Sequence, residues 1–363
     1  MLAERRIQPA NFSGSYLPED VTFLLKPVSL AATAREQKEA LIQSGRRHYS
    51  ELIGKETVPD ENYMALFHAA ERRNRARLAA DIASLAGHLA RRAEGREIVL
   101  VSLARGGTPI GVLLVRMLRH LGARSVHYSV SIIRDRGIDL EALRHIASLH
   151  DPADAVFVDG WTGKGAIAGE LRRALAERPF GFSPTLAVVA DPAGQADIAA
   201  TADDYLIASG LLNGIVSGLV SRSILSAKTV GPGDFHACVT YPQLAPQDLS
   251  RAFVDRLFDA ARTSLVSDIS THCLRRAELQ RACAAMLDEA MLRTGTRDPN
   301  LIKPGIAEAT RVFLRRMPAR LFIRDPDDPD VEHLIHLAKQ AGVAVDRLSG
   351  GAYRAVAVIG RAP

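Results

Sequence analysis

The sequence predicts an α/β protein built on an open, mostly parallel sheet with flanking helices, followed by a second, smaller α/β domain. Two observations support this prediction. Short apolar and β-branched runs alternate with helical stretches between residues 97 and 191, and glycine-rich turns follow several of these runs. After a candidate linker at 294–299 (TGTRDP), the same alternation begins again on a smaller scale. Strands alternating with helices favour a parallel sheet, which binds ligands at the carboxyl ends of its strands.

Each expected element follows from its local pattern. The N-terminal region, 1–95, is expected to be an ordered arm followed by helices at 33–49 and 60–94. In the core region, 96–293, we expect strands at 97–103, 125–133, 155–159 and 185–191, helices at 110–121, 139–149 and 166–178, and a helical stretch over 246–293. In the C-terminal region, 300–363, we expect helices at 305–316 and 328–341 and strands at 320–324, 343–347 and 355–359.

The composition is that of an ordinary globular protein. Apolar residues make up 47% and charged residues 24%, which excludes a mostly disordered chain. The formal net charge of +5 permits a polyanionic partner without requiring one. Cys238, Cys273 and Cys283 are too widely spaced for a disulfide framework or a paired-thiol zinc site. No apolar run approaches the ~18 residues of a membrane span. We therefore expect a cytoplasmic protein and assign no metal ligands.

The first expected strand runs into a glycine-rich turn that contains Arg105, Gly106 and Gly107. Without Cβ atoms the backbone comes close to an oxyanion, and the N–H groups that open the next helix point toward it. Arg105 adds a forked donor for a phosphate or pyrophosphate. The alternative interpretation is a tight turn with a surface arginine.

A second turn of this kind follows the strand at 155–159. Asp159 ends the strand, and Thr162, Gly163, Lys164 and Gly165 lead into the next helix. Free N–H groups and a hydroxyl suit a terminal phosphate, while the carboxylate accepts from sugar hydroxyls. The turn is not a Walker A loop, because Val158 and Gly165 stand where that loop has a glycine and a serine or threonine.

Together the two turns resemble the pyrophosphate and ribose 5-phosphate loops of type I phosphoribosyltransferases. More closely, five segments resemble a bacterial phosphoribosyltransferase-like family that accompanies tellurium-resistance and stress-response gene clusters, a family also named cysteine protease StiP. These segments are 14–28, 102–111, 157–166, 203–223 and 234–244. The resemblance covers about residues 12–290.

The resemblance implies a reaction of 5-phosphoribosyl 1-diphosphate with a nucleobase-like small-molecule acceptor, in the biosynthesis of a stress-linked nucleoside. Arg105 and Asp159 would be the catalytic residues, with Arg105, Gly106 and Gly107 holding pyrophosphate. Thr162, Gly163, Lys164 and Gly165 would hold the 5-phosphate, and Mg²⁺ would be the cofactor. A homo-oligomer is compatible with the sequence.

One position departs from the family pattern and leaves a second function class open. Type I phosphoribosyltransferases carry two adjacent acids, and Gly160 stands at the second position. Gly160 favours a non-catalytic module that binds ribose phosphate or RNA, whereas the intact Arg105 loop favours an enzyme. A cysteine protease is the third alternative, with Cys238 as nucleophile and His236 two residues before it. No recognised nucleophile signature surrounds Cys238.

The C-terminal region resembles the Pelota-type RNA-binding domain. The matching residues begin a helix, and by this resemblance Gly305, Glu308 and Arg311 would contact RNA. Ala307 stands where that superfamily has asparagine, so phosphate contact is expected more than base reading. The alternative is a dimerisation or substrate-presenting domain.

Three further residues are candidates for the substrate pocket. Arg134 follows the second strand, where this fold usually carries a mobile or substrate-contacting turn, and Asp191 ends the fourth strand. His236 lies in the segment 234–244 that shares the family resemblance.

Overall fold

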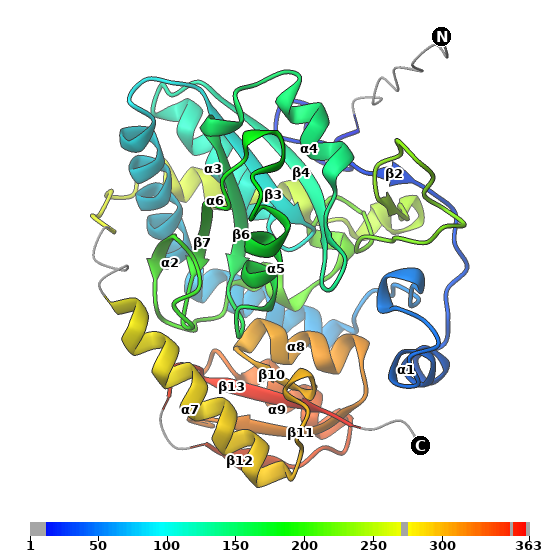
Figure 1. The fold of residues 1–363 in the computed structure, drawn as a ribbon. Coiled ribbons are helices and arrows are strands. Elements are labelled where there is room, and N and C mark those ends of the chain that lie inside the picture. Colours follow the sequence, from blue (N-terminus) through cyan, green and yellow to red (C-terminus); the bar gives the residue numbers. More distant parts are fainter. Residues whose placement is uncertain (1–11, 270–274, 349–350, 361–363) are drawn as a thin grey trace.

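The computed structural model describes residues 12–269, 275–348 and 351–360. Its larger sheet has the strand order β1-β4-β3-β6-β7-β8, and every neighbouring pair along this path is parallel (Figure 1). The strands are β1 (Thr22–Leu24), β3 (Ile98–Ala104), β4 (Ser125–Ile133), β6 (Ala155–Trp161), β7 (Leu186–Ala190) and β8 (Ile198–Thr201). A short strand, β5 (Gly137–Ile138), pairs antiparallel with β4. The predicted mostly parallel α/β sheet is confirmed.

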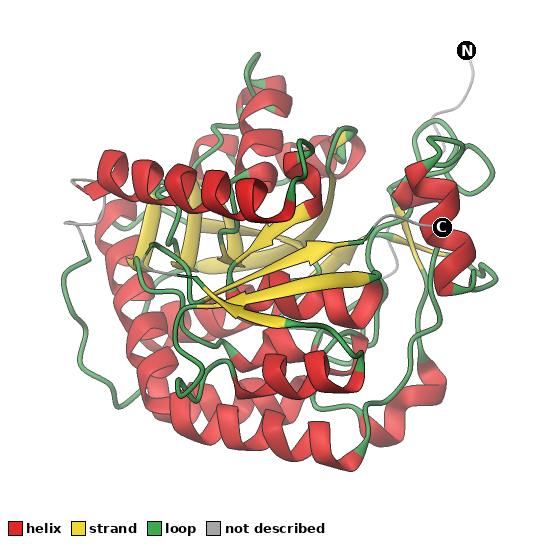
Figure 2. Cartoon of the chain, turned by 90° about the horizontal axis from the view of Figure 1, so that it is seen from below, coloured by secondary structure: helices red, strands yellow, loops and turns green. Residues whose placement is uncertain are grey.

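Helices cover both faces of this sheet (Figure 2). On one face lie α2 (Glu61–Ala93), α3 (Thr108–His120) and α6 (Ser250–Ala261), and on the other lie α4 (Leu140–Ala147) and α5 (Ala166–Ala174). Successive residues of β3 point to opposite faces, so Leu100 joins the first core and Val99 and Val101 join the second. This two-sided burial explains why the strands are continuous apolar runs in the sequence.

The long helix α2 is delimited by local signals that the sequence contains. The Asp60 carboxylate accepts a hydrogen bond from the Tyr63 backbone N–H at 2.8 Å, which caps the first turn. Arg91 and Arg92 lie in the last turn, where positive charge is favourable, and Glu94 ends the helix in the left-handed conformation. The helix therefore begins and ends within a residue or two of the expected bounds.

A second sheet of four strands forms the C-terminal region, in the order β10-β13-β11-β12. Its strands are β10 (Ile302–Pro304), β11 (Pro318–Ile323), β12 (Val345–Arg347) and β13 (Ala355–Ile359), with helices α7 (Arg276–Thr294), α8 (Ile306–Arg315) and α9 (Glu332–Gln340). The buried residues of α7, among them Cys283 and Met286, pack against this sheet. The structure thus places α7 with the C-terminal sheet, whereas the sequence analysis grouped it with the core.

The remaining elements are short. The N-terminal arm contributes β2 (Lys26–Pro27), which pairs with β9 (Ala237–Cys238), and α1 (Arg35–Gln43), which is shorter than the expected helix at 33–49. The 3-10 helices are η1 (Tyr49–Glu51), η2 (Pro152–Asp154), η3 (Pro179–Gly181), η4 (Ala208–Leu211), η5 (Gly214–Val216), η6 (Pro242–Gln247) and η8 (Pro299–Leu301). Six of the described strands were not expected: β1, β8 and β10, and the two-residue strands β2, β5 and β9.

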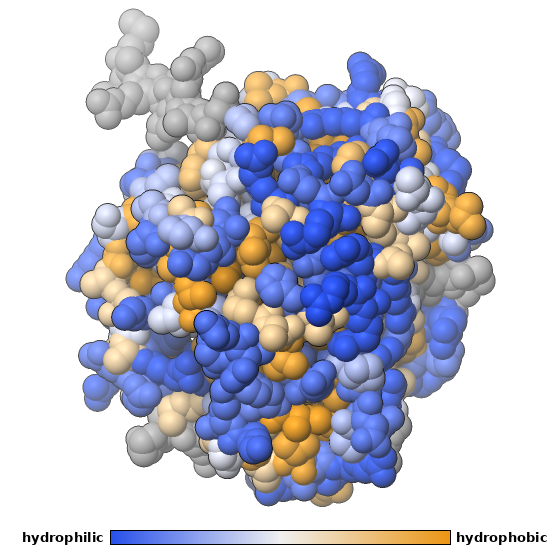
Figure 3. All heavy atoms as spheres, turned by 180° about the vertical axis from the view of Figure 1, so that it is seen from behind, coloured by the Kyte–Doolittle hydropathy of each residue, from blue (hydrophilic) through white to orange (hydrophobic). Residues whose placement is uncertain are grey.

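The C-terminal region packs directly on the larger sheet's domain. In Figure 1 it lies below the larger sheet, with α8 between that sheet and the smaller one. Ile306, Ala309 and Val312 of α8 belong to the same buried cluster as residues of α2 and η4. The face shown in Figure 3 is largely hydrophilic, with apolar residues in separate patches. Among the described helices, none combines the length and apolar character needed to cross a membrane.

Candidate functional site

The strand order creates a switch point between β3 and β6. From β3 the chain crosses to β4 on one side, whereas from β6 it crosses to β7 and then β8 on the other side. Open α/β sheets bind ligands in the crevice outside the carboxyl ends of the strands at such a point. The Arg105 loop (104–108) follows β3 and the phosphate loop (160–166) follows β6, so both predicted loops meet there.

Gly107 makes this meeting of the two loops possible. A Cβ atom on Gly107 would lie 2.4 Å from the Val158 carbonyl oxygen and 3.0 Å from the Asp159 Cα. No other residue fits, because real Cβ atoms do not approach backbone so closely. The loop then enters α3, whose first residue, Thr108, hydrogen-bonds Ser129 of β4 at 2.8 Å between their hydroxyl oxygens. The Arg105 loop is thereby fixed against the end of β6.

The Arg105 side chain is buried, and the partners of its guanidinium lie outside the phosphate loop. Its guanidinium donates to the Val220 carbonyl oxygen at 2.6 Å and to the Asn213 side-chain oxygen at 3.0 Å. It also pairs with the Glu56 carboxylate at 3.6 Å. Arg105 also lines a cavity between α1 and α8 (the larger cavity), which has a volume of about 600 Å³. The predicted pyrophosphate arginine is therefore partnered within the chain.

Asp159 lies at the mouth of the phosphate loop in an environment that disfavours its charge. Burial raises the pKa of its carboxyl to about 6, against the opposing effect of the Arg311 guanidinium. The Gly160 backbone N–H donates to the carboxylate at 2.8 Å. A carboxyl group with a raised pKa in a cleft is typical of a functional position, because stability alone does not favour it.

Asp191, predicted to line the substrate pocket, instead holds the start of the phosphate loop by hydrogen bonds. Its buried carboxylate accepts from the Thr162 hydroxyl at 2.5 Å and from the backbone N–H groups of Gln195 and Ala196 at 2.8 and 2.9 Å. Asp191 therefore positions Thr162. It lines neither the larger cavity nor the small cleft between the phosphate loop and α8.

Helix α8 covers the phosphate loop, an arrangement that the sequence analysis did not predict. The Arg311 guanidinium lies 4.8 Å from the centre of the Trp161 ring and forms an ion pair with Glu308 at 2.6 Å. The Trp161 indole N–H donates to the same carboxylate at 3.4 Å. A Cβ atom on Gly163 would lie 3.2 Å from the Glu308 Cγ atom. Glu308 and Arg311, predicted to contact RNA, thus contact the phosphate loop.

The C-terminal region also holds other groups of the phosphate loop. The Lys164 ammonium donates to the carbonyl oxygens of Pro299 and Ile302, and burial lowers the pKa of this lysine to about 8. The Tyr353 hydroxyl donates to the Gly163 carbonyl oxygen at 3.1 Å. The cleft that remains between loop and helix has a volume of about 80 Å³. Groups of the C-terminal region therefore fill most of the space beside the phosphate loop.

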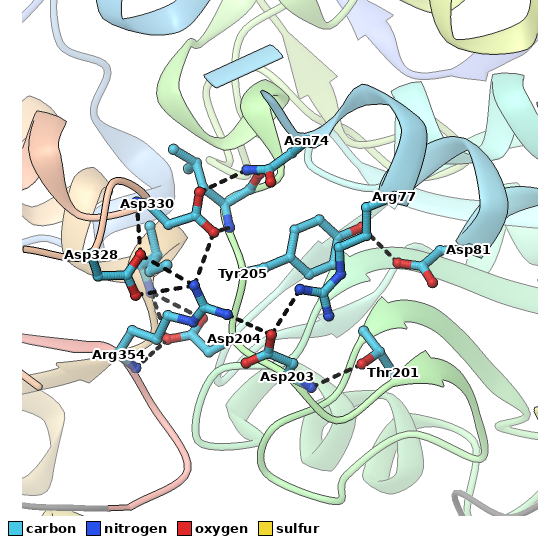
Figure 4. Close-up of polar contacts among 12 residues, drawn as sticks. Asn74, Arg77, Asp81, Thr201, Asp203, Asp204, Tyr205, Asp328, Asp330 and Arg354 are labelled. Atoms are coloured by element: carbon cyan, nitrogen blue, oxygen red, sulfur yellow. Dashed lines mark hydrogen bonds and ion pairs between the residues drawn. The ribbon is translucent and has the colours of Figure 1, made fainter. Parts of the chain in front are cut away.

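A buried network of acids fixes α8 in this place (Figure 4). The Asp204 carboxylate accepts from the Ile306 backbone N–H, at the start of α8, at 3.2 Å and from the Arg354 backbone N–H at 2.8 Å. The Arg354 guanidinium pairs with Asp203, Asp328 and Asp330 at 2.5 to 3.1 Å. Burial raises the pKa of Asp204 to about 7. Gly305, with a φ of +93°, takes the turn that leads into α8.

The other two candidates for the substrate pocket form their hydrogen bonds and ion pairs outside the phosphate loop, although the Arg134 charge is close enough to help lower the pKa of Lys164. The Arg134 side chain pairs with Asp135 at 3.1 Å, and its backbone N–H donates to the Tyr49 hydroxyl. His236 hydrogen-bonds Ser131 at 2.7 Å between Nδ1 and the hydroxyl oxygen. Neither lines the cleft or the larger cavity.

The fold and the loops define an α/β protein with two glycine-containing loops at a switch point, covered by a small C-terminal domain. The chain belongs to the StiP family, because the family model described as "Tellurite-like stress resistance cysteine protease StiP" matches residues 14–258. A relative named "Cysteine protease StiP" from Acinetobacter baylyi is 40% identical over 375 residues, covering 98% of this chain and 96% of that protein. The description "PELOTA RNA binding domain" matches residues 281–361. The resemblances to the StiP family and to the Pelota-type RNA-binding domain are confirmed.

Solved structures with a similar arrangement are distant. The chain resembles hypoxanthine phosphoribosyltransferase of Trypanosoma cruzi with 14% identity and a TM-score of 0.28, over 47% of this chain and 90% of that one. A NifS-like protein aligns over 94% of this chain and 93% of its own, with 10% identity and a TM-score of 0.24. The fold assignment therefore rests on the strand order and not on these similarities.

Proposed function

We propose that the chain binds 5-phosphoribosyl 1-diphosphate at the switch point and transfers the phosphoribosyl group to a nucleobase-like small-molecule acceptor. The observation that supports this proposal is the contact of the two loops. Gly107 lies against Val158 and Asp159, so an anion held by one loop is adjacent to a sugar held by the other. The product would be a nucleoside-like compound.

Each group of the ligand has a counterpart in the chain. The loop Thr162–Gly165 would bind the 5-phosphate through the N–H groups of Gly163, Lys164 and Gly165. Thr162, whose hydroxyl and N–H already donate to Asp191 and Ala190, would position that loop. Asp159, ionised above pH 6, would accept hydrogen bonds from the ribose hydroxyls. Arg105, on exchanging its contacts with Glu56 and Asn213 for the ligand, and the Gly106 N–H would bind the diphosphate. The Gly107 N–H already donates to the Leu103 carbonyl oxygen at 3.0 Å, so Gly107 would contribute by letting the diphosphate approach the backbone. In the reaction the bond from C1 to the diphosphate oxygen breaks, a bond from C1 to the acceptor forms, and the acceptor loses a proton.

Magnesium would enter with the diphosphate. Mg²⁺ is usually held by one or two carboxylates together with substrate phosphates, and Asp159 supplies one such carboxylate. No group of three metal-ligating side chains occurs among residues 12–269, 275–348 and 351–360, so a metal site made by the protein alone is not expected. When bound, magnesium neutralises charge on the leaving diphosphate.

The described cysteines do not support a thiol protease. Burial raises the pKa of the Cys238 thiol to about 12, and its side chain is fully buried. The nearby His236 is hydrogen-bonded to Ser131, not to this thiol. Cys283 is also buried and contacts the Tyr353 hydroxyl at 3.0 Å. Cys273 lies outside the described residues. A nucleophilic thiol needs an accessible thiolate beside a base, and neither described cysteine has one.

Calorimetric titration with 5-phosphoribosyl 1-diphosphate and Mg²⁺ tests the proposal. We expect micromolar binding by the unmodified chain and at least a tenfold loss, ~1.4 kcal/mol, in Asp159→Asn. The matched control is Asp259→Asn, because the Asp259 side chain is 70% exposed on α6, away from the site. Absence of binding at millimolar ligand, or equal binding by the two variants, would reject the proposal.

A further inference from the structure

The larger cavity lies beside the Arg105 loop and is built by several separate parts of the chain. Its walls come from α1, from the segment between α1 and α2, from the loop after η4, and from α8 and α9, together with Arg105, Arg222 and Tyr241. Its volume of about 600 Å³ lies within the range of pockets that enclose small molecules. The cavity is therefore large enough for a ligand that the cleft of about 80 Å³ cannot hold.

The charges that line this cavity are strongly unbalanced. Six cationic side chains face two carboxylates; the cations are Arg35, Lys38, Lys55, Arg105, Arg222 and Arg315. Both carboxylates already have partners. Asp60 caps α2, and Glu56 accepts from the Gly214 backbone N–H at 2.6 Å and pairs with Arg105. Within the described parts of the chain, none of the five other cations forms an ion pair with a carboxylate.

The cations of the cavity also crowd one another. Asn213 accepts hydrogen bonds from both Arg105 and Arg315 on a single side-chain oxygen. Burial, together with Arg222 and other neighbouring arginines, lowers the pKa of Lys38 to about 8, and burial beside Arg105 lowers that of Arg315. The Nη1 atom of Arg222 is buried without an acceptor in the described structure. Unpaired charge of one sign in a concave site attracts ions of the opposite sign.

Part of the remaining wall is apolar. The rings of Tyr241 and Phe313 and the side chains of Ile215 and Leu212 line the cavity beside the cations. A ligand-binding site typically combines such apolar walls with a few placed polar groups. Flat aromatic or heterocyclic molecules fit this combination better than inorganic ions, which have no apolar surface to bury.

The cavity adjoins the proposed phosphoribosyl site. Arg311 lines the cleft at the phosphate loop, and Arg315 lines the cavity one helical turn further along α8. Four residues of α-helix advance by ~6 Å, so neighbouring turns of one helix border the two sites. The helix α8 therefore joins the cavity to the cleft that Asp159 lines.

We propose that this cavity binds an aromatic or heterocyclic molecule that carries two negative charges. Resting on the proposed function, the inference identifies this molecule as the acceptor, so that the acceptor is an anionic ring compound and not a neutral nucleobase. Arg315 and Lys38 bind its charges, while Tyr241 and Phe313 contact its ring. The C-terminal domain then contributes two side chains of α8, Phe313 and Arg315, to the acceptor site.

Calorimetry with two probes of the same shape tests this inference. Pyridine-2,6-dicarboxylate carries two charges, whereas pyridine-2,6-dicarboxamide has the same ring and none. We expect the dicarboxylate to bind at least tenfold more tightly than the dicarboxamide at pH 7. Lys38→Met should weaken dicarboxylate binding by about tenfold, as expected for one lost charge contact in a partly buried site.

Two further variants keep the test decisive. Lys55→Met removes a more exposed cation of the same cavity, so it preserves the fold if Lys38→Met does not, and should weaken binding by about threefold. Lys228→Met is the matched control, because Lys228 is exposed and lies outside the cavity. Equal binding of the two probes, or dicarboxylate binding that is unchanged in Lys55→Met, would overturn the inference.

The inference and the proposed function fail separately. If the dicarboxylate binds in the cavity but 5-phosphoribosyl 1-diphosphate does not bind, the anion site stands and the transferase proposal falls. If only 5-phosphoribosyl 1-diphosphate binds, the transferase proposal stands and the anionic acceptor is rejected.

Discussion

The buried carboxylate of Asp159 is expected to destabilise the folded chain at neutral pH, and the substitution Asp159→Asn should remove this effect. Burial raises this pKa to about 6 from an ordinary value of 3.8. A difference of about two pH units corresponds to ~3 kcal/mol between the protonated and ionised forms. Asp159→Asn retains the shape of the side chain and has no charge to bury. We expect the free energy of unfolding at pH 7.5 to rise by up to ~3 kcal/mol in this variant.

The sign follows from the protons bound by each state. Between about pH 4 and pH 6 the folded chain retains a proton on Asp159 that the unfolded chain has lost. The contribution of this group to stability therefore falls as the pH rises through that window and stays constant above it. The unmodified chain should lose stability relative to Asp159→Asn between pH 4 and pH 6, and the difference should be constant from pH 7 to pH 8.

Urea unfolding followed by circular dichroism measures this difference. The midpoints of the unmodified chain, Asp159→Asn and the exposed control Asp259→Asn are compared at pH 4.5, 6 and 7.5. We expect only Asp159→Asn to move upward with pH relative to the unmodified chain. A variant that is less stable at pH 7.5, or a difference that does not depend on pH, would refute the reasoning about burial of this carboxyl.

Three other expected outcomes concern Glu308, Cys238 and Arg354. Glu308 lies against Gly163, where a phosphate would bind, so Glu308→Gln should tighten binding of 5-phosphoribosyl 1-diphosphate about tenfold in calorimetry; weaker binding would mean that this carboxylate assists the ligand. Native protein treated with iodoacetamide should carry no label on Cys238 by mass spectrometry, and rapid labelling would contradict the buried thiol. Arg354→Met leaves Asp203, Asp328 and Asp330 without their shared partner and should cost ~2–4 kcal/mol in urea unfolding, with faster proteolysis near residues 294–299; an unchanged midpoint would show that this network does not hold the C-terminal domain.

The sequence predicted the strands that carry long buried runs. β3, β4, β6 and β7 lie within two residues of their expected bounds because each is a β-branched, apolar stretch followed by a turn. β1, β8 and β10 have three or four residues each and carry no such pattern. Their extended conformation depends on pairing with a neighbouring strand, which a local pattern does not contain.

The candidate site also combines features that a local sequence pattern predicts with features that depend on contacts between distant segments. The meeting of the Arg105 loop with Asp159 follows from a parallel sheet, and the sequence predicted both loops. The contact of Glu308 with Trp161 joins residues 147 positions apart, and it depends on how the C-terminal domain docks. The direction of the Arg105 side chain likewise depends on Glu56 and Asn213, which local spacing does not connect to it. RNA binding through Gly305, Glu308 and Arg311 stays a prediction.

The central claim is that the phosphate loop binds the phosphoribosyl ligand, and the fluorescence of Trp161 tests it most directly. Trp161 is the only tryptophan of the chain, and it lies in that loop between Arg311 and Glu308. Titration with 5-phosphoribosyl 1-diphosphate and Mg²⁺ should change its emission in a saturable way at micromolar ligand, and Asp159→Asn should shift the curve at least tenfold. An emission spectrum that stays constant up to millimolar ligand would contradict the account.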